Sequence, residues 1–285
     1  MKKILISIMA LAMAVNAAAQ GTGGAREQRG RGGFEASLDL PEVYRDDNVV
    51  FRKIDDHTWI GSGHVMASES LYLLEGSERA VLIDAGTEIP DLDKIVATLT
   101  DKPVTLLLTH VHPDHVGGAK YFSELWVNPS DIPSMKGMMP DYTGKVNKLK
   151  DGQRFELGCR TLETFFTPGH TWGSTTFLEV GTDRGFSGDS FGNGNLLLTT
   201  DFSTLINTCK KSYEYFSKNG YVKFYNGHFF GDNFETLKRI SDLEKIGEEV
   251  LAGTLKGEER GGMPGLNKVV RRDGVNVNYG DAQMK

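Results

Sequence analysis

The stretch Thr109-His110-Val111-His112-Pro113-Asp114-His115 contains three of the seven histidines of the chain together with one carboxylate. An apolar run at 104–108 precedes it and is typical of a buried strand. The glycine pair at 117–118 follows it and indicates a tight turn at the start of a helix. Imidazole and carboxylate groups at the end of a buried strand have the composition of a metal site, so the sequence predicts one here.

The spacing of these residues favours two metal ions rather than one. His110 and His112 are two positions apart, so in an extended chain their side chains point to the same side. We expect this pair to serve one ion, and Asp114 and His115 to serve a second ion beside it. Each ion then needs at least one more protein ligand from elsewhere in the chain.

Four further polar residues stand where an apolar strand ends in a glycine-marked turn. Strand ends gathered at one edge of a sheet bring fixed side chains together around a ligand. The two histidines among them can complete the two ions, and Asp189 can bridge because a carboxylate has two oxygens. Nitrogen and oxygen coordination with open positions is typical of catalytic rather than structural zinc sites. The four residues are Asp84, His170, Asp189 and His228, in the segments 81–86, 167–171, 186–190 and 225–228.

The order of these motifs resembles the metallo-β-lactamase fold superfamily. The pattern His110-x-His112-x-Asp114-His115 is the signature of that superfamily, and the segments 167–171, 186–189 and 226–228 follow in its order. The resemblance covers roughly residues 49–251. It implies an α/β fold, namely an αββα sandwich of two mixed β-sheets with helices on the outer faces.

Within the superfamily the pattern is most similar to the glyoxalase II type of site. That resemblance implies a first metal, a second metal and an aspartate between them, with a further carboxylate that orients the cluster from behind its ligands. It assigns His110, His112 and His170 to the first metal, Asp114, His115 and His228 to the second, Asp189 to the bridge, and Asp84 to the orienting role.

The same resemblance implies a metal-dependent hydrolase. Two Zn²⁺ ions per chain are expected, with iron or manganese as alternatives, and a hydroxide that bridges the ions would attack a small ester, thioester, lactone or amide. Asp114 is expected to accept or relay a proton besides binding metal. The substrate-binding residues, the identity of the substrate and the oligomeric state stay open at this point.

Two other activities of the same fold remain as alternatives. One is β-lactam hydrolysis, which export would suit, although β-lactamases of this fold generally lack the bridging aspartate that Asp189 would supply. The other is a mononuclear-iron sulfur dioxygenase, which uses a subset of the same ligands. The flavo-diiron branch is disfavoured because it has an acid where His112 stands.

The first residues differ in kind from the rest. Lys2 and Lys3, an apolar core at 4–15 and three alanines at 17–19 predict a secretory signal peptide over 1–19, too short for stable membrane insertion. We expect a flexible segment at 20–48, a single domain at 49–285, and export to a bacterial periplasm or the exterior. The 38 acidic residues against 32 basic ones, a net charge of −6, argue against a nucleic-acid partner and favour a small-molecule substrate.

The remaining chain predicts strands with few helices before the motif and strands followed by helices after it. The segment 129–147 is expected to be irregular, either a lid or a substrate loop, although its methionines fit ordinary packing equally well. The expected strands are 49–54, 58–60, 71–74, 80–83, 104–108, 125–127, 154–157, 162–166, 175–180, 185–187 and 224–225, the expected helices are 91–99, 119–124, 201–218 and 233–251, and a hairpin is expected at 268–277.

Several side chains have two interpretations. Cys159 and Cys209 can form one disulfide in an exported protein, but we favour two buried thiols. Trp172, two residues after His170, is expected to pack in the core rather than to line a pocket. His57 is expected to be solvated, and His64 belongs either to the site or to the surface.

Overall fold

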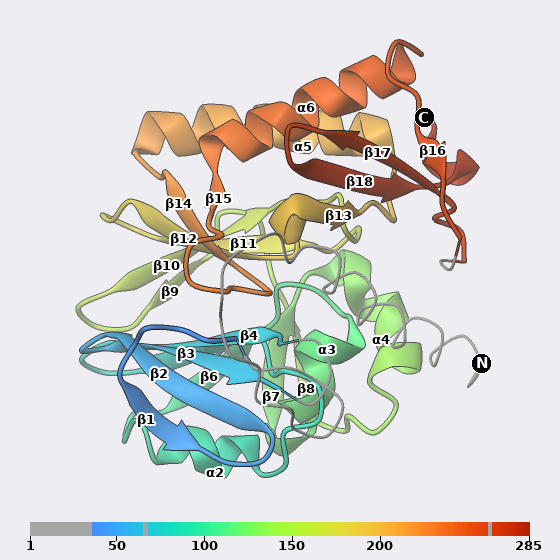
Figure 1. Ribbon diagram of the computed structural model, residues 1–285. Coiled ribbons are helices and arrows are strands. Elements are labelled where there is room, and N and C mark those ends of the chain that lie inside the picture. Colours follow the sequence, from blue (N-terminus) through green and yellow to red (C-terminus); the bar gives the residue numbers. More distant parts are fainter. Residues whose placement is uncertain (1–35, 65–67, 262–263) are drawn as a thin grey trace.

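The computed structural model describes residues 36–64, 68–261 and 264–285. Two β-sheets lie face to face, and helices cover the outer face of each, so the predicted αββα sandwich is confirmed (Figure 1). A third, smaller sheet lies beside α5 and α6 at the C-terminal end of the chain (Figure 1). The sequence did not predict this third sheet.

The first sheet has eight strands that follow one another in chain order. Neighbours from β1 to β5 are antiparallel, and neighbours from β5 to β8 are parallel, so the sheet is mixed. The strands are β1 (Glu42–Arg45), β2 (Val49–Asp55), β3 (Thr58–Gly63), β4 (Ser70–Glu75), β5 (Ala80–Ile83), β6 (Val104–Leu107), β7 (Glu124–Val127) and β8 (Lys145–Lys148).

The second sheet has six strands in the order β15-β14-β12-β11-β10-β9, and only the β12–β14 pair is parallel among them. Its strands are β9 (Arg154–Glu156), β10 (Thr161–Phe166), β11 (Thr175–Glu179), β12 (Arg184–Gly188), β14 (Lys223–Asn226) and β15 (Glu235–Thr236). The third sheet is β13 (Asn195–Leu197), β18 (Val275–Tyr279), β17 (Lys268–Arg272) and β16 (Glu258–Glu259), in that order.

Capping residues mark the ends of the long helices. Asp201 caps α5 by accepting a hydrogen bond from Thr204 N–H, and Gly220, with φ of 81°, ends it. Thr236 caps α6 by accepting from Arg239 N–H. The helices are α2 (Leu92–Ala97), α3 (Pro113–Val116), α4 (Ile132–Met138), α5 (Phe202–Asn219) and α6 (Leu237–Leu251), with short 3-10 helices η1 (Gly117–Tyr121), η2 (Pro129–Asp131), η3 (Gly192–Gly194) and η4 (Asp281–Gln283).

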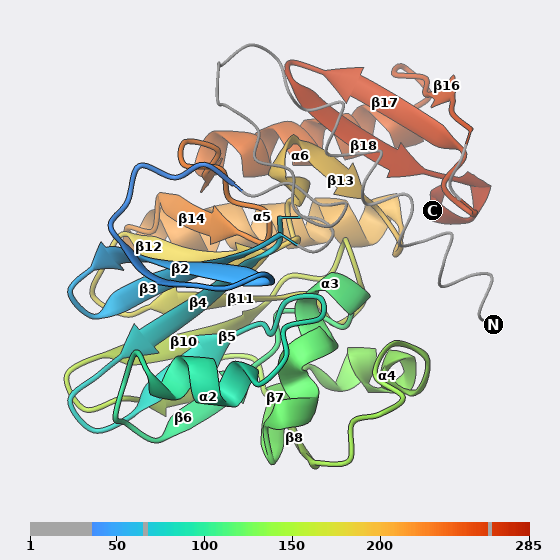
Figure 2. The same cartoon turned by 60° about the horizontal axis from the view of Figure 1, so that its bottom comes forward.

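Three buried apolar clusters correspond to the three interfaces between these layers. Successive residues of a strand face opposite sides, so Leu71 and Leu73 of β4 pack under α2 while Tyr72 and Leu74 pack between the sheets. The third cluster joins the outer face of the second sheet to α5 and α6. In the turned view of Figure 2, α2 crosses the outer face of the first sheet. Because the central strands of both sheets are buried on both faces, side chains at their ends stand on a rigid base.

Two segments are more ordered than the sequence predicted. Ala36 and Leu38 are buried and β1 pairs with β2, so the packed chain includes residues that the sequence placed in a flexible segment before 49. The segment from 129 contains η2 and α4 rather than an irregular loop. Its methionines pack against the cluster under the first sheet, which agrees with ordinary packing. Residues 1–35, with the predicted signal peptide, lie outside the described residues.

Two expectations about single side chains were wrong. Cys159 lies in the turn between β9 and β10 and is exposed, whereas Cys209 of α5 is buried, and both are free thiols. Trp172 is 53% exposed rather than part of the core. Cys159 and Trp172 stand in turns. Loops lie on the protein surface, so an apolar side chain there is not buried as it would be in a strand or a helix of the core.

Candidate metal centre

The decisive stretch forms a strand end followed directly by a short helix. β6 ends at Leu107, and His112 has φ of −122° and ψ of 156°, an extended conformation that the following proline favours. Pro113 occupies the first turn of α3, where its fixed φ suits a helix and its missing N–H costs nothing. The chain therefore turns from extended to helical between His112 and His115, which separates the histidine pair from the Asp114–His115 pair.

Three histidines form one group, which we call the first triad: His110, His112 and His170. His112 Nδ1 lies 3.1 Å from His110 Nε2 and 2.8 Å from His170 Nε2. His170 comes from the turn between β10 and β11, so the triad joins the ends of strands from both sheets. All three ligand atoms lie within 4.8 Å of one another.

Asp114, His115 and His228 form the second triad. Asp114 Oδ2 lies 3.8 Å from His115 Nε2 and 3.5 Å from His228 Nε2. His228 follows β14, so this triad also joins the two sheets. Every residue that the sequence predicted as a ligand is therefore brought into one cluster, and the role of each as a ligand stays a prediction.

Asp189 lies between the two triads. Its Oδ2 atom is 3.7 Å from His170 Nε2, 3.7 Å from His115 Nε2 and 3.4 Å from His228 Nε2. It also forms a third possible ligand group with His110 and His115. This position beside both triads is the one expected for a bridging carboxylate.

Hydrogen bonds behind the cluster fix which ring nitrogen faces its centre. His115 Nδ1 lies 2.9 Å from Asp84 Oδ2, and His170 Nδ1 lies 2.9 Å from the carbonyl oxygen of Leu197. An ionised carboxylate and a carbonyl only accept hydrogen bonds, so each Nδ1 carries a proton and donates. The Nε2 atom of each ring is therefore left for the centre, the arrangement that metal-binding histidines use.

Asp84 also controls His110, through Thr109. Asp84 Oδ1 accepts from Thr109 N–H at 2.7 Å, and Asp84 Oδ2 accepts from the Thr109 hydroxyl at 2.7 Å. Because the hydroxyl proton goes to the carboxylate, Thr109 Oγ1 accepts from His110 Nδ1 at 3.1 Å. Asp84 has φ of 62°, a left-handed conformation that aspartate tolerates better than most residues. The predicted orienting role of Asp84 agrees with these contacts.

The residues present fit bound metal ions. His115 Nε2 and Asp189 Oδ1 are buried polar atoms with no hydrogen-bond partner in the described part of the chain. A Cβ on Gly227 would lie 2.2 Å from Asp189 Oδ1 and 2.7 Å from His115 Cε1, so only glycine leaves these groups in place. A buried imidazole nitrogen and a carboxylate oxygen that have no other partner and lie side by side are suited to bind a cation. The mixed imidazole and carboxylate donor set suits zinc, iron or manganese.

Two histidines of the first triad, His110 and His112, are held as neutral imidazole. Burial, together with the neighbouring imidazoles, lowers the pKa of His110 well below its usual value and lowers the pKa of His112 to about 3. Neutral imidazole is the form that binds metal, so no proton has to leave His110 or His112 before an ion binds near neutral pH.

The pKa values of the histidines in the second triad shift in the opposite direction. Burial lowers the pKa of His228, but Asp189 and Asp114 outweigh it and raise that pKa to about 9. The pKa of His115 is likewise raised against burial by Asp114 and Asp189, and the pKa of Asp189 is held well below its usual range by His228 and His115. Metal binding here would displace protons from the two imidazoles, so zinc uptake is expected to release protons.

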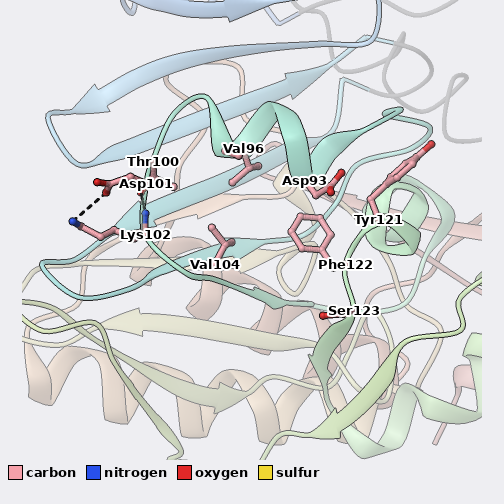
Figure 3. A pocket seen from close by; sticks show the side chains of 10 residues that line it. Asp93, Val96, Thr100, Asp101, Lys102, Val104, Tyr121, Phe122 and Ser123 are labelled. Atoms are coloured by element: carbon pink, nitrogen blue, oxygen red, sulfur yellow. Dashed lines mark hydrogen bonds and ion pairs between the residues drawn. The ribbon is translucent and has the colours of Figure 1, made fainter.

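One side of the cluster is open to solvent. His110, His115 and His170 are buried, whereas the side chains of Asp114, Asp189 and His228 keep 14–15% of their surface exposed. A small molecule can therefore approach at the edge formed by these three residues. A separate surface pocket lies around α2 and the start of β6, with an Asp101–Lys102 ion pair at its rim, and its lining residues include none of the cluster (Figure 3).

Sequence reasoning missed one residue at the cluster. Asp131 is buried and accepts hydrogen bonds from Val111 N–H, Thr171 Oγ1–H and Gly173 N–H. These donors are far from Asp131 in the chain, and only the Asn-Pro-Ser-Asp turn at 128–131 marks the position locally. His64 is buried at the end of β3, and His57 is exposed and contacts Glu75.

The profile of the metallo-beta-lactamase superfamily matches residues 67–254. The chain belongs to this superfamily. Among solved structures, a metallo-beta-lactamase from Pontibacter korlensis aligns over 70% of this chain and 99% of its own, with a TM-score of 0.57 and 18% identity. That level of identity supports the shared fold alone.

Several curated relatives within the superfamily are named as hydrolases. A hydroxyacylglutathione hydrolase of Gloeobacter violaceus is 31% identical over 41% of this chain and 45% of its own length. An acyl-coenzyme A thioesterase of Bos taurus is 24% identical over 60% and 77%. A probable polyketide biosynthesis zinc-dependent hydrolase of Bacillus velezensis is 29% identical over 62% and 82%. The chain spans about half the length of other curated relatives that it matches.

The predicted membership of the superfamily is therefore confirmed, and a hydroxyacylglutathione hydrolase is among the relatives. Among the described residues, no helix is both long and apolar enough to cross a membrane.

Proposed function

We propose that this chain is a dinuclear metal-dependent hydrolase, with zinc as its metal, that cleaves a small ester or thioester. The observation that carries the proposal is the position of Asp189 between the triads. Its Oδ2 atom lies 3.7 Å from His170 Nε2 in the first triad and 3.4 Å from His228 Nε2 in the second. A carboxylate in that place is suited to bridge two neighbouring ions.

When bound, two divalent cations supply polarisation of a substrate carbonyl oxygen and a water that is activated near neutral pH. The chain supplies the frame for this chemistry. The rings of His110, His115 and His170 are locked by their Nδ1 hydrogen bonds, so their Nε2 atoms cannot turn away. Asp114 stands at the open edge, where its carboxylate can take up or relay the proton of the attacking water.

The substrate class follows from the open edge and the relatives. An approach past Asp114, Asp189 and His228 suits a small acyl compound whose carbonyl reaches the cluster. The names of the hydroxyacylglutathione hydrolase and the acyl-coenzyme A thioesterase favour a thioester among the esters, thioesters, lactones and amides considered. The name of the Bacillus velezensis relative favours zinc.

Metal analysis combined with a substrate panel tests the proposal. We expect two zinc ions per chain, and hydrolysis of thioesters that is lost with a chelator and restored by zinc. The panel should also contain esters, lactones, amides and a β-lactam, because β-lactam turnover alone would favour the β-lactamase alternative. One iron per chain with oxygen consumption would replace the proposal with the sulfur dioxygenase alternative.

Asp189→Asn tests the bridging role itself. We expect this variant to hold fewer than two zinc ions and to lose about 100-fold or more of its activity, because one bridging oxygen becomes an amide. Asp183→Asn is the matched control, since Asp183 is an exposed residue of the turn before β12 and should leave both measurements unchanged. If Asp189→Asn keeps both its zinc and its activity, the bridging assignment is wrong.

We also propose that the chain is exported after removal of residues 1–19. The proposal rests on the two lysines, the apolar core and the alanines of that segment. Expression in a bacterium, fractionation and N-terminal sequencing test it, and we expect a periplasmic or secreted protein that begins at Gln20. A cytoplasmic protein that retains Met1 would contradict it.

A further inference from the structure

We propose that Asp131 is the positioning residue of the first triad, and that it sets the zinc affinity of that triad without touching the metal. The inference rests on the proposed metal binding but not on hydrolysis. Asp131 stands where η2 meets α4 and is 3% exposed. The superfamily signature residues do not include it, and nothing in its immediate sequence links it to the histidines.

The hydrogen bonds of Asp131 join the two chain segments that carry the triad. Its Oδ2 atom accepts from Val111 N–H at 3.0 Å, and Val111 is the residue between His110 and His112. The same oxygen accepts from the Thr171 hydroxyl at 2.9 Å, and Thr171 follows His170 directly. One carboxylate oxygen therefore ties both segments together, although His112 and His170 are 58 positions apart in the chain.

The other carboxylate oxygen fixes the turn after His170. Asp131 Oδ1 accepts from Gly173 N–H at 2.8 Å. A Cβ on Gly173 would lie 2.4 Å from Asp131 Cγ, so the turn packs directly against the carboxylate. Thr171 N–H donates to Ser174 Oγ at 2.9 Å, which closes the same turn. The turn that follows His170 is thus fixed by hydrogen bonds at Thr171 and at Gly173.

The triad needs such a support because its ring nitrogens face one another. His112 Nδ1 lies within 2.8 Å of His170 Nε2 and within 3.1 Å of His110 Nε2. These nitrogens come from two separate chain segments, so one ion can bind all three only while the two segments keep their relative position. A hydrogen bond to a carboxylate is stronger than one between neutral groups, which makes Asp131 suited to hold that position.

The chain provides a closely matched control for Asp131. Asp46, in the turn between β1 and β2, also accepts two backbone N–H groups, those of Asn48 at 2.7 Å and Val49 at 2.9 Å, and one hydroxyl, that of Tyr44 at 3.0 Å. The donor set is therefore the same as at Asp131, but none of the three donors flanks a residue of the triads. Asp46 is half-buried whereas Asp131 is buried, so Asp46→Asn sets a lower limit for the stability cost of Asp131→Asn. Only Asp131→Asn should weaken zinc binding.

The test is a zinc titration of full-length wild type and both variants against a chromophoric chelator, with melting of the metal-free proteins in parallel. We expect Asp131→Asn to weaken one of the two zinc sites by about 10- to 100-fold, as other outer residues of metal sites do. The affinity for the second zinc should be unchanged, and metal-free Asp131→Asn should still melt as a folded protein. Unchanged zinc affinity in Asp131→Asn, or an equal loss in Asp46→Asn, would overturn the inference.

Thr171→Val keeps the inference testable if Asp131→Asn does not fold. This variant retains the Asp131 carboxylate and removes the Thr171 hydroxyl, which donates to Asp131 and lies 3.0 Å from Ser174 Oγ. We expect a loss of about 2- to 10-fold in the affinity of the same zinc site. An unchanged affinity would overturn the inference. The wild type separates failure of the proposed function from failure of this inference. If the proposed function is wrong, the wild type binds no zinc tightly, or binds zinc without hydrolysing any substrate of the panel.

Discussion

Asp84 Oδ2 lies 2.9 Å from His115 Nδ1 and accepts the hydroxyl hydrogen bond of Thr109 at 2.7 Å. Since Thr109 in turn accepts from His110 Nδ1, a single carboxylate oxygen orients one histidine of each triad. Asp131 has a different function, because it holds backbone segments rather than imidazole rings. The cluster therefore has one carboxylate for ring orientation and another for backbone position.

Asp84→Asn is predicted to weaken zinc binding at both triads. The amide presents two hydrogens where His115 and Thr109 need an acceptor, so the rings of His115 and His110 lose the partner that fixes their Nε2 atoms. We expect zinc affinity to fall by about 10- to 100-fold, measured by chelator competition.

Asp91→Asn is the control for the backbone at Asp84. Asp91 has φ of 55°, close to the 62° of Asp84, and its side chain is exposed. Asparagine tolerates this left-handed conformation, so neither substitution should strain the backbone. Wild-type zinc affinity in Asp84→Asn would contradict the orienting role.

A second prediction concerns the pH dependence of stability. Glu235 is buried, its Oε1 atom accepts from Asn193 N–H, and its Oε2 atom has no partner within the described residues. Burial raises the pKa of Glu235 from 4.5 to about 7. The folded state therefore prefers protonated Glu235, and this contribution is fully present below about pH 4.5 and is lost as the pH rises through about 7.

Glu235→Gln is predicted to remove that dependence. A pKa rise from 4.5 to about 7 corresponds to about 3 kcal/mol of stability, so the difference between variant and wild type should change by about that amount between acid and pH 8. Urea unfolding across this pH range measures it. Glu248→Gln, at an exposed position of α6, is the control and should leave the wild-type pH dependence intact. If the free energy of unfolding of wild type and of Glu235→Gln changed in parallel with pH, the prediction would be contradicted.

The cysteines give a third prediction. Cys159 is exposed and Cys209 is buried, and burial raises the pKa of the Cys209 thiol. Because the thiolate is the reactive form, a thiol reagent should modify one cysteine per native chain and two after unfolding. Cys159→Ser should abolish native labelling, whereas Cys209→Ser should not. Absence of labelling in the unfolded wild type without reductant would indicate a disulfide instead.

The residues of the cluster were predictable because each is marked locally. An apolar strand, a glycine turn and a histidine or aspartate recur at 84, 170, 189 and 228, and Pro113 marks the change from strand to helix inside the motif.

The features that were missed depend on contacts between distant segments. Asp131 reaches Val111 and Gly173 across separate strands, and no period or spacing connects them in the sequence. The third sheet depends on β13 pairing with β18, where Asn278 Nδ2 donates to the Leu196 carbonyl across 82 positions. Cys159 and Trp172 were misjudged because side-chain type predicts burial poorly inside turns.

Trp172 gives the last prediction, which concerns the substrate. Its side chain is 53% exposed only two residues after His170, and the turn that carries it is fixed by hydrogen bonds at Thr171 and Gly173. An exposed indole on a rigid turn beside the cluster offers apolar area to an acyl or aryl group of the substrate. We expect Trp172→Ala to raise KM for apolar acyl thioesters by about tenfold with a smaller change in kcat. Trp172→Phe should restore most of the affinity, and Tyr213→Ala, at an exposed aromatic of α5, should leave KM unchanged. A KM for Trp172→Ala that equals the wild-type value for both short and long acyl groups would show that the substrate does not contact this ring.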